Sequence, residues 1–483
     1  MRAKNLIIIT CDEMRGDAPG FMGNPDCLTP NIDNFAEKGI VFNQHFAVYG
    51  KCVPSRISMM TGRYSHTDGY RTIQQLMPSD QPNLVGKLKE LNYETAVFGL
   101  NHVWEDFFGD NSKSSGYVDY HSFTEDSFDF INDKKWPVEQ PDQDSREPLE
   151  LEDGYQYKGR IEKDLTFHDD CNRAEQAIHY LDEVRDKSRP FYMQLNLSRP
   201  HPPYAVEEPY FSMYDRDKIT PWPYKLPENA PLPLIKMREI RTGLEDPEEN
   251  FRELQAVYYG MITKVDTLVG KVIETIKAQG LLEDSVVIFT VDHGDFAGQY
   301  GLPEKWDTAM QDCILHVPLI IHAPGLNKER DVDSLTQHID LAPTIMDLLG
   351  IEADWGIHGE SLLPIINGDK RKSAIFAEGG HEEEMWSRFN SPVSDKRCGK
   401  QDTYRYCPET MSRTKMVRTD DWKLIIRLTG GNELYNMKDD PQETHNIYGN
   451  PQYNDIILDL QQKMIEWCLK TDTDQPFQKD VIA

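Results

Sequence analysis

The chain has 483 residues, of which 39% are hydrophobic and 10% aromatic, enough apolar material for a large core; this excludes a generally disordered protein. Its 52 basic and 81 acidic residues give a formal charge of −29, so the summed field repels nucleic acid and anionic membrane surfaces. We therefore expect no nucleic-acid or membrane partner, and an anionic substrate would need a local cation cluster or a metal.

The start of the chain and its cysteines indicate the compartment. The opening apolar run, Leu6 to Ile9, is too short for a transmembrane helix or a signal-peptide core. The sequence indicates a cytoplasmic protein, or a periplasmic or secreted one if a leader is removed during maturation. The eight cysteines are scattered without a C-x-x-C pair, so we expect mostly reduced, buried thiols. A disulfide stays open for Cys398 and Cys407, which flank a polar loop.

Strands and helices alternate along most of the chain. The β-branched apolar run at 5–10 predicts a buried strand, and the apolar stripe of the next segment predicts a helix. The same alternation recurs in the segments 29–39 (helix), 83–92 (helix), 94–99 (strand), 171–184 (helix), 190–198 (strand), 249–279 (helix) and 285–290 (strand). Such alternation predicts an α/β fold with a large mixed, mostly parallel sheet sandwiched by helices.

Three parts of the chain depart from this pattern. Residues 106–166 and 202–247 are rich in proline, acidic and aromatic residues with little periodicity, and are predicted to be surface insertions that build walls around a site. After a strand-like run ending at Glu378 the composition changes, and 416–428 and 432–437 have the pattern of hairpin strands, followed by a helix near 452–470. We therefore predict a large α/β domain over 1–378, carrying the active site, and a small α+β subdomain with an antiparallel sheet over 379–483.

Chemically capable side chains follow several predicted strands. Asp12 and Glu13 come after the first strand, and Asp292 and His293 follow the strand at 285–290. Ligands of open α/β sheets gather at the carboxyl ends of the strands. Either pair alone is typical of a helix cap or a solvated surface. Together they predict a site for a divalent cation, Ca²⁺ because oxygen predominates, or Mn²⁺ because of the imidazole.

Two histidines and a lysine occupy similar positions. His102 and His201 each follow a predicted strand, which favours proton transfer or anion binding over a purely structural role. Lys305 would ordinarily be a surface residue, and only its nearness in sequence to the proposed metal site singles it out.

The stretch 52–63, "CVPSRISMMTGR", raises the question whether Cys52 is a packed thiol, a disulfide partner, a thiolate or the precursor of another group. It matches the signature C-x-P-S-R-x-x-x-x-T-G-R of the type I sulfatases, members of the alkaline phosphatase superfamily. The stretches "PHPPY", "VDHGD", "GLPEK" and "DLAPTIMDLLG" agree in the same order. The chain thus resembles this family over nearly its whole length, and the resemblance implies an alkaline-phosphatase-like fold.

The resemblance also implies roles for individual residues. A formylglycine-generating enzyme would oxidise Cys52 to Cα-formylglycine, whose hydrate is the nucleophile of the family. Asp12, Glu13, Asp292 and His293 would hold the cation together with the modified Cys52, although many relatives have Asp or Gln at the position of Glu13. By the same resemblance, Arg56 would help to shape the metal site. His201 and Lys305 would contact the bridging oxygen of the ester, and His102 would assist the release of sulfate.

One departure from the family pattern bears on the substrate. Many sulfatases have Gly-Lys-x-His where this chain has Gly99-Leu100-Asn101-His102, so one expected cation is replaced by Leu100. The walls of the substrate site are expected to include Asp68, Arg71, His381 and Arg388, since cations and polar groups suit sulfated sugars; Trp386 and Arg405 fit packing equally well.

Three functions follow. The first is a sulfatase that cleaves a sulfate monoester of a small molecule or glycan, and we expect the substrate to be a carbohydrate. The alternatives are a phosphonate monoester or phosphodiester hydrolase, which the missing cation favours, and a glycan-binding module without catalysis. We also expect Cys52 to be an exposed side chain at a strand end, so that its replacement by alanine leaves the fold intact.

Overall fold

The structure is a computed structural model that describes residues 3–78, 80–105, 120–122, 156–161, 170–243, 247–326, 331–386 and 399–472. Its main sheet has the strand order β2-β10-β9-β1-β7-β4-β5. In that order the strands are Ile40–Val41, Leu319–His322, Ser285–Val291, Asn5–Asp12, Phe191–Pro200, Glu94–Gly99 and Tyr120–Ser122. Strands β9, β1, β7, β4 and β5 are parallel, and β10 is antiparallel to both of its neighbours. The prediction of a mixed, mostly parallel sheet is confirmed.

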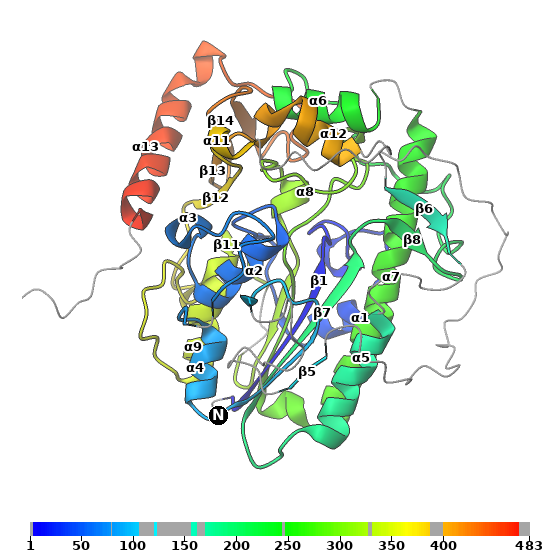
Figure 1. Cartoon of the computed structure of the whole chain (residues 1–483), viewed down its shortest axis with the longest axis vertical. Helices are drawn as coiled ribbons and strands as arrows, with labels where there is room; N and C mark the ends of the chain where they lie inside the picture. Colours follow the sequence, from blue (N-terminus) through cyan, green and yellow to red (C-terminus); the bar gives the residue numbers. More distant parts are fainter. Residues whose placement is uncertain are drawn as a thin grey trace, which may run out of the picture.

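Helices cover both faces of this sheet (Figure 1). Side chains of β1 alternate between two cores because successive residues of a strand point to opposite faces. Ile7 and Ile9 pack in the core that also contains residues of α1, α5 and α7, and Leu6 and Ile8 in the core shared with α2, α4 and α9. These helices span Pro30–Ala36, Asp170–His179 and Glu248–Ala278 on the first face, and Cys52–Thr61, Leu84–Glu90 and Leu341–Leu349 on the second.

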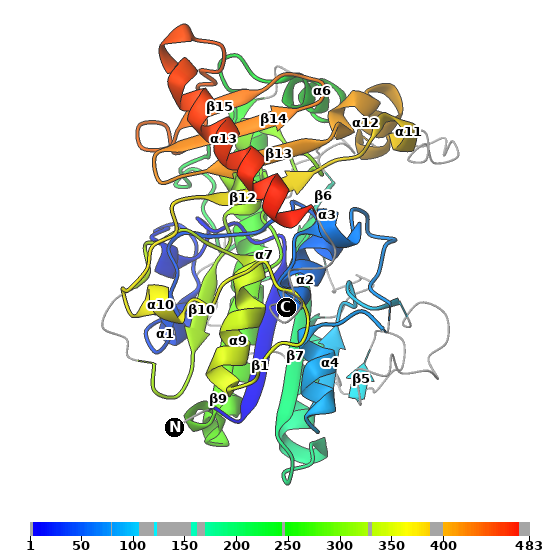
Figure 2. The ribbon, with the colours of Figure 1, turned by 90° about the vertical axis from the view of Figure 1, so that its left-hand side faces the viewer.

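A second, four-stranded antiparallel sheet lies beyond the carboxyl ends of β1 and β7 (Figure 2). Its strands β12 to β15 are Ile375–Gly379, Thr414–Arg418, Trp422–Arg427 and Glu433–Asn436, and the helices nearby are α6 Leu232–Arg241, α11 Glu383–Trp386, α12 Gly399–Tyr406 and α13 Asn454–Thr471. The predicted hairpin strands and the closing helix are therefore present. Because β12 already belongs to this sheet, the small unit draws on residues before 379, and the division at 378 stays a prediction.

The segment 202–247 is not a set of surface loops. It contains β8 Tyr204–Val206, which pairs with β6 Tyr157–Arg160, and the helix α6. Tyr204 and Phe211 are fully buried. Prolines interrupt this segment, so its apolar residues lack helical spacing although they pack into the core. The remaining short elements are β3 His45–Phe46, β11 Thr336–Gln337, α3 Ser65–Asp68, α8 Asp312–Leu315 and α10 Leu363–Ile366.

Candidate active site

The ends of β1 and β9 bring two acidic residues together. The strands are adjacent and parallel, with Cys11 opposite Val291, so Asp12, the last residue of β1, lies beside Asp292, which follows β9. Cys52 reaches the same place as the first residue of α2. Ligand atoms of Asp12, Cys52, Asp292 and His293 all lie within 4.8 Å of one another, and all four residues are buried. We call these four residues the ligand group.

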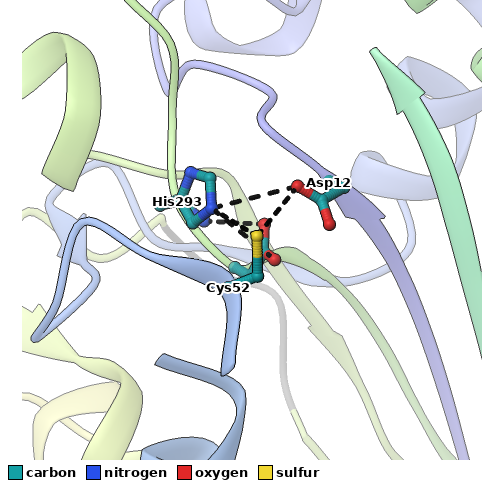
Figure 3. Close-up of side chains that lie close together, drawn as sticks. Asp12, Cys52 and His293 are labelled. Atoms are coloured by element: carbon teal, nitrogen blue, oxygen red, sulfur yellow. Dashed lines mark hydrogen bonds and ion pairs between the residues drawn. The ribbon is translucent and has the colours of Figure 1, made fainter. Parts of the chain in front are cut away.

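Short contacts link the members of the ligand group. The thiol of Cys52 donates to Oδ1 of Asp12 at 3.6 Å, and Nε2 of His293 lies 3.2 Å from Sγ of Cys52 (Figure 3). Nδ1 of His293 lies 3.0 Å from the carbonyl oxygen of Gly294 and donates to it, which leaves Nε2 with its lone pair toward the group. Cys52 is 2% exposed and begins a helix, so the expectation of an exposed strand-end side chain is wrong.

Arg56, one turn along α2, holds both aspartates. Its Nε donates to Oδ2 of Asp292 at 2.8 Å, and its Nη2 to Oδ2 of Asp12 at 3.3 Å. All three side chains are fully buried. Burial alone would raise the pKa of Asp292, but the Arg56 guanidinium outweighs it and holds that pKa well below its usual value. Asp292 is thus ionised at neutral pH.

Negative charge exceeds positive charge among these groups. Burial, and then the nearby Asp292, raise the pKa of Asp12; burial, and then Asp12, raise the pKa of the Cys52 thiol well above its usual value. Burial lowers the pKa of His293 to about 4, so its imidazole is neutral. Buried carboxylates beside a neutral imidazole form a donor set for a divalent cation, which would supply the missing positive charge. The residues present therefore fit the implied metal.

Glu13, Lys305 and His201 form a second group next to the first. Nζ of Lys305 lies 2.7 Å from Oε1 of Glu13 and 2.8 Å from Nε2 of His201, and Nδ1 of His201 donates to the Pro202 carbonyl oxygen at 2.6 Å. Burial, and then the charge of Lys305, lower the pKa of His201 to about 3. A neutral His201 therefore accepts a hydrogen bond from the Lys305 ammonium. Glu13 faces this pair and lies outside the ligand group, although it shares a second possible ligand set with Asp12 and His201.

The loop after β4 contributes an imidazole to the site. Nδ1 of His102 lies 3.8 Å from Oδ2 of Asp12, and the His102 side chain is 25% exposed. The neighbouring amide of Asn101 is bonded within its own loop, to the backbone nitrogens of Val103 and Trp104 and to the Trp104 carbonyl. Asn101 therefore does not supply the polar group that Leu100 leaves out.

The predicted substrate-binding residues have protein partners. Asp68 pairs with Arg63 at 3.1 Å, and Arg71 binds the carboxylate of Glu382 at 2.6 and 2.8 Å. His381 lies 3.4 Å from Oδ2 of Asp307. Arg388 lies outside the described residues. Cys398 also lies outside them, so the predicted disulfide between Cys398 and Cys407 stays a prediction. The substrate-binding roles stay predictions.

Several polar residues of the site were missed. Thr10 in β1 and Asn196 in β7 bond to each other at 2.6 Å, and both contact Nη1 of Arg56. Ser55 donates to the Asp292 carbonyl oxygen at 2.6 Å and lies 2.9 Å from Nδ1 of His338. A polar residue inside a strand predicted to be buried is a signal that would have singled out Thr10 and Asn196.

Comparison with known proteins agrees with this geometry. The family model described as Sulfatase matches residues 4–351. The chain belongs to the sulfatase family. A second model, described as the C-terminal part of N-sulphoglucosamine sulphohydrolase, matches residues 396–470 of this family member.

Relatives extend over most of the chain. The multifunctional alkaline phosphatase superfamily protein PehA of Trinickia caryophylli is 27% identical, covering 97% of this chain and 96% of that protein. The N-acetylglucosamine-6-O-sulfatase of Bacteroides thetaiotaomicron is 23% identical over 99% and 88%. The phosphonate monoester hydrolase of Agrobacterium radiobacter shares the fold, with a TM-score of 0.73, 22% identity and coverage of 97% and 96%. No helix in the described parts of this sulfatase-family chain is long and apolar enough to cross a bilayer.

Proposed function

We propose that this sulfatase-family enzyme hydrolyses a sulfate monoester of a carbohydrate. The observation that carries the proposal is the buried ligand group around Cys52, with the Lys305–His201 pair beside it. The ligand group suits a cation and a nucleophile, and the pair suits a departing oxygen. The carbohydrate is proposed because a relative that covers nearly the whole chain is named for a sulfated sugar.

The cation proposed is Ca²⁺, with Mn²⁺ as the alternative. Asp12, Asp292 and His293 would hold it together with the modified Cys52, and Glu13 stays a predicted further ligand. When bound, such a cation neutralises sulfate oxygens and favours ionisation of the nucleophilic hydroxyl.

The nucleophile is proposed to be formylglycine, made from Cys52 by a formylglycine-generating enzyme. The hydrated aldehyde supplies two hydroxyl groups, one to take up sulfate and one to release it. The unmodified thiol suits the reaction poorly, because its raised pKa keeps it protonated and a hard cation prefers oxygen. Arg56 orients Asp12 and Asp292 around this group.

The remaining residues act on the leaving group and the sulfate. The Lys305 ammonium, with His201 beside it, donates a hydrogen bond to the bridging oxygen and stabilises the negative charge that develops there. We assign assistance of sulfate release to His102, and this role is supported by its distance of 3.8 Å from Asp12.

Phosphonate monoester or phosphodiester hydrolysis is a second candidate. It is favoured by Leu100 and by the inward-bonded amide of Asn101, which leave this loop without the cation expected of many sulfatases. We expect kcat/KM for 4-nitrophenyl sulfate to exceed that for 4-nitrophenyl phenylphosphonate, measured on the same modified enzyme. A preference of about 1,000-fold for the phosphonate, roughly 4 kcal/mol in transition-state binding, would contradict the sulfatase proposal.

Mass spectrometry distinguishes the two catalytic functions from that of a glycan-binding module without catalysis. We expect the peptide containing Cys52, from natively produced protein, to carry the aldehyde. Full retention of the thiol, together with glycan binding and no ester cleavage, would support the non-catalytic function instead. A screen of sulfated mono- and disaccharides by sulfate release then identifies the sugar.

A further inference from the structure

The residue before Lys305 has an unusual backbone and unusual partners. Glu304 has φ +61, in the left-handed region that disfavours residues with a side chain, and it is 2% exposed. A glycine would relieve the backbone cost at this position. A buried carboxylate at such a position points to a function of the side chain.

Three separate segments donate to this one carboxylate. Nη2 of Arg241, on α6, lies 2.9 Å from Oε2, and the amide of Gln156 donates to the same oxygen. The ammonium of Lys400, on α12, binds Oε1. These cations hold the pKa of Glu304 well below its usual value although burial opposes them. Glu304 therefore joins the segment of Gln156, α6 and α12 to the active-site loop.

The two residues that follow Lys305 are also anchored by contacts with distant segments. Trp306 donates through Nε1 to the Thr410 carbonyl oxygen at 3.0 Å and stacks on Tyr404 of α12, with ring centroids 4.7 Å apart. Asp307 accepts a hydrogen bond from Lys51 at 2.5 Å. Between these anchors, the Lys305 ammonium points to Glu13 and His201, and lies 3.9 Å from Oε1 of Glu304.

We propose that Glu304 is a positioning residue, which fixes the Lys305 ammonium at the bridging oxygen and connects it to α6 and α12. The inference rests on the function proposed for Lys305 above. The effect of losing this position should depend on the leaving group of the substrate. The alcohol of a sugar sulfate needs the ammonium as its bond to sulfur breaks, whereas nitrophenolate leaves as a stable anion with little assistance.

The test compares two substrates in the Glu304→Gln variant, which keeps the side-chain shape. We expect kcat for a sugar sulfate to fall by about 10- to 100-fold, and kcat for 4-nitrophenyl sulfate by less than about 3-fold. The Lys305→Met variant should show the same selectivity, and the double variant should lose little more than Lys305→Met alone, because both changes act on one interaction. An equal loss on both substrates, or additive losses in the double variant, would overturn the inference.

The matched control is Glu433→Gln in β15. Glu433 is also a buried glutamate held by an arginine, Arg427, and by an amide, that of Gln311, but it lies in the small sheet. If Glu433→Gln lowers the amount of folded protein, both substrates should be affected equally, so the ratio of kcat for the sugar sulfate to kcat for 4-nitrophenyl sulfate should stay unchanged. If Glu304→Gln does not fold, Lys400→Met, which removes one donor from a partly exposed position, should show the same selectivity with a smaller loss.

Failure of the sulfatase proposal can be distinguished from failure of the role proposed for Glu304. Wild-type enzyme that releases no sulfate from either ester but cleaves phosphonate monoesters contradicts the sulfatase proposal alone, and the same variants are then compared on aryl and alkyl phosphonates. Wild-type enzyme that cleaves none of these esters contradicts both proposals.

Discussion

Replacing Cys52 with alanine is expected to lower the turnover of a sulfate ester by about 10⁴-fold or more, because it removes the source of the proposed nucleophile while the other three ligands and the Lys305–His201 pair remain. The fold should survive. Cys52 is buried, but the substitution removes a single sulfur atom, and we expect a loss of about 1 kcal/mol in the free energy of unfolding. Steady-state sulfate release and a thermal melt measure the two effects.

Cys27→Ala is the control for this experiment. Cys27 is also buried, at 3% exposure, but packs in the core on the α1, α5 and α7 face of the sheet. Its loss should affect stability to a similar degree and leave turnover unchanged. Wild-type turnover in Cys52→Ala would show that another group is the nucleophile.

Removal of divalent cations by a chelator is expected to lower activity by at least about 100-fold. Without the cation, the ligand group leaves only buried negative charge beside the sulfate oxygens, which the cation would otherwise neutralise. Addition of Ca²⁺, or of Mn²⁺ if that is the native ion, should restore it. The cation should also raise the melting temperature, since a ligand at about 100 times its Kd stabilises the folded state by about 2.7 kcal/mol. Asp292→Asn should abolish both the turnover and the thermal shift.

A second aspartate separates metal binding from general destabilisation. Asp266 is buried on α7, where it accepts hydrogen bonds from Asn31 and Ile32, away from the ligand group. Asp266→Asn should keep the Ca²⁺-induced shift in melting temperature even if its own melting temperature is lower. Full activity after exhaustive chelation, or an unchanged shift in Asp292→Asn, would rule out the cation site proposed.

Much of the site was accessible from local sequence patterns. Asp12 and Asp292 were found because they end apolar runs, and parallel neighbours in a sheet must bring such ends together. Apart from the family resemblance, only nearness in sequence to the predicted metal site singles out Lys305, and its contact with His201 requires the folded chain. Glu304 gave no local signal, since an exposed Glu-Lys pair has the same sequence as this buried one.

Local sequence therefore determined the alternation of strands and helices, the ends at which chemistry could occur and the Cys52 motif, because burial periodicity and turn chemistry act over a few residues. The tertiary structure decided where side chains point. It turned Glu13 toward Lys305 rather than into the ligand group, buried Cys52 at a helix start, turned Asn101 into its own loop, and brought Gln156, Arg241 and Lys400 onto Glu304. The physical reason is that direction and partner depend on backbone angles and on contacts between residues far apart in the chain, such as Glu13 and Lys305, which are 292 positions apart.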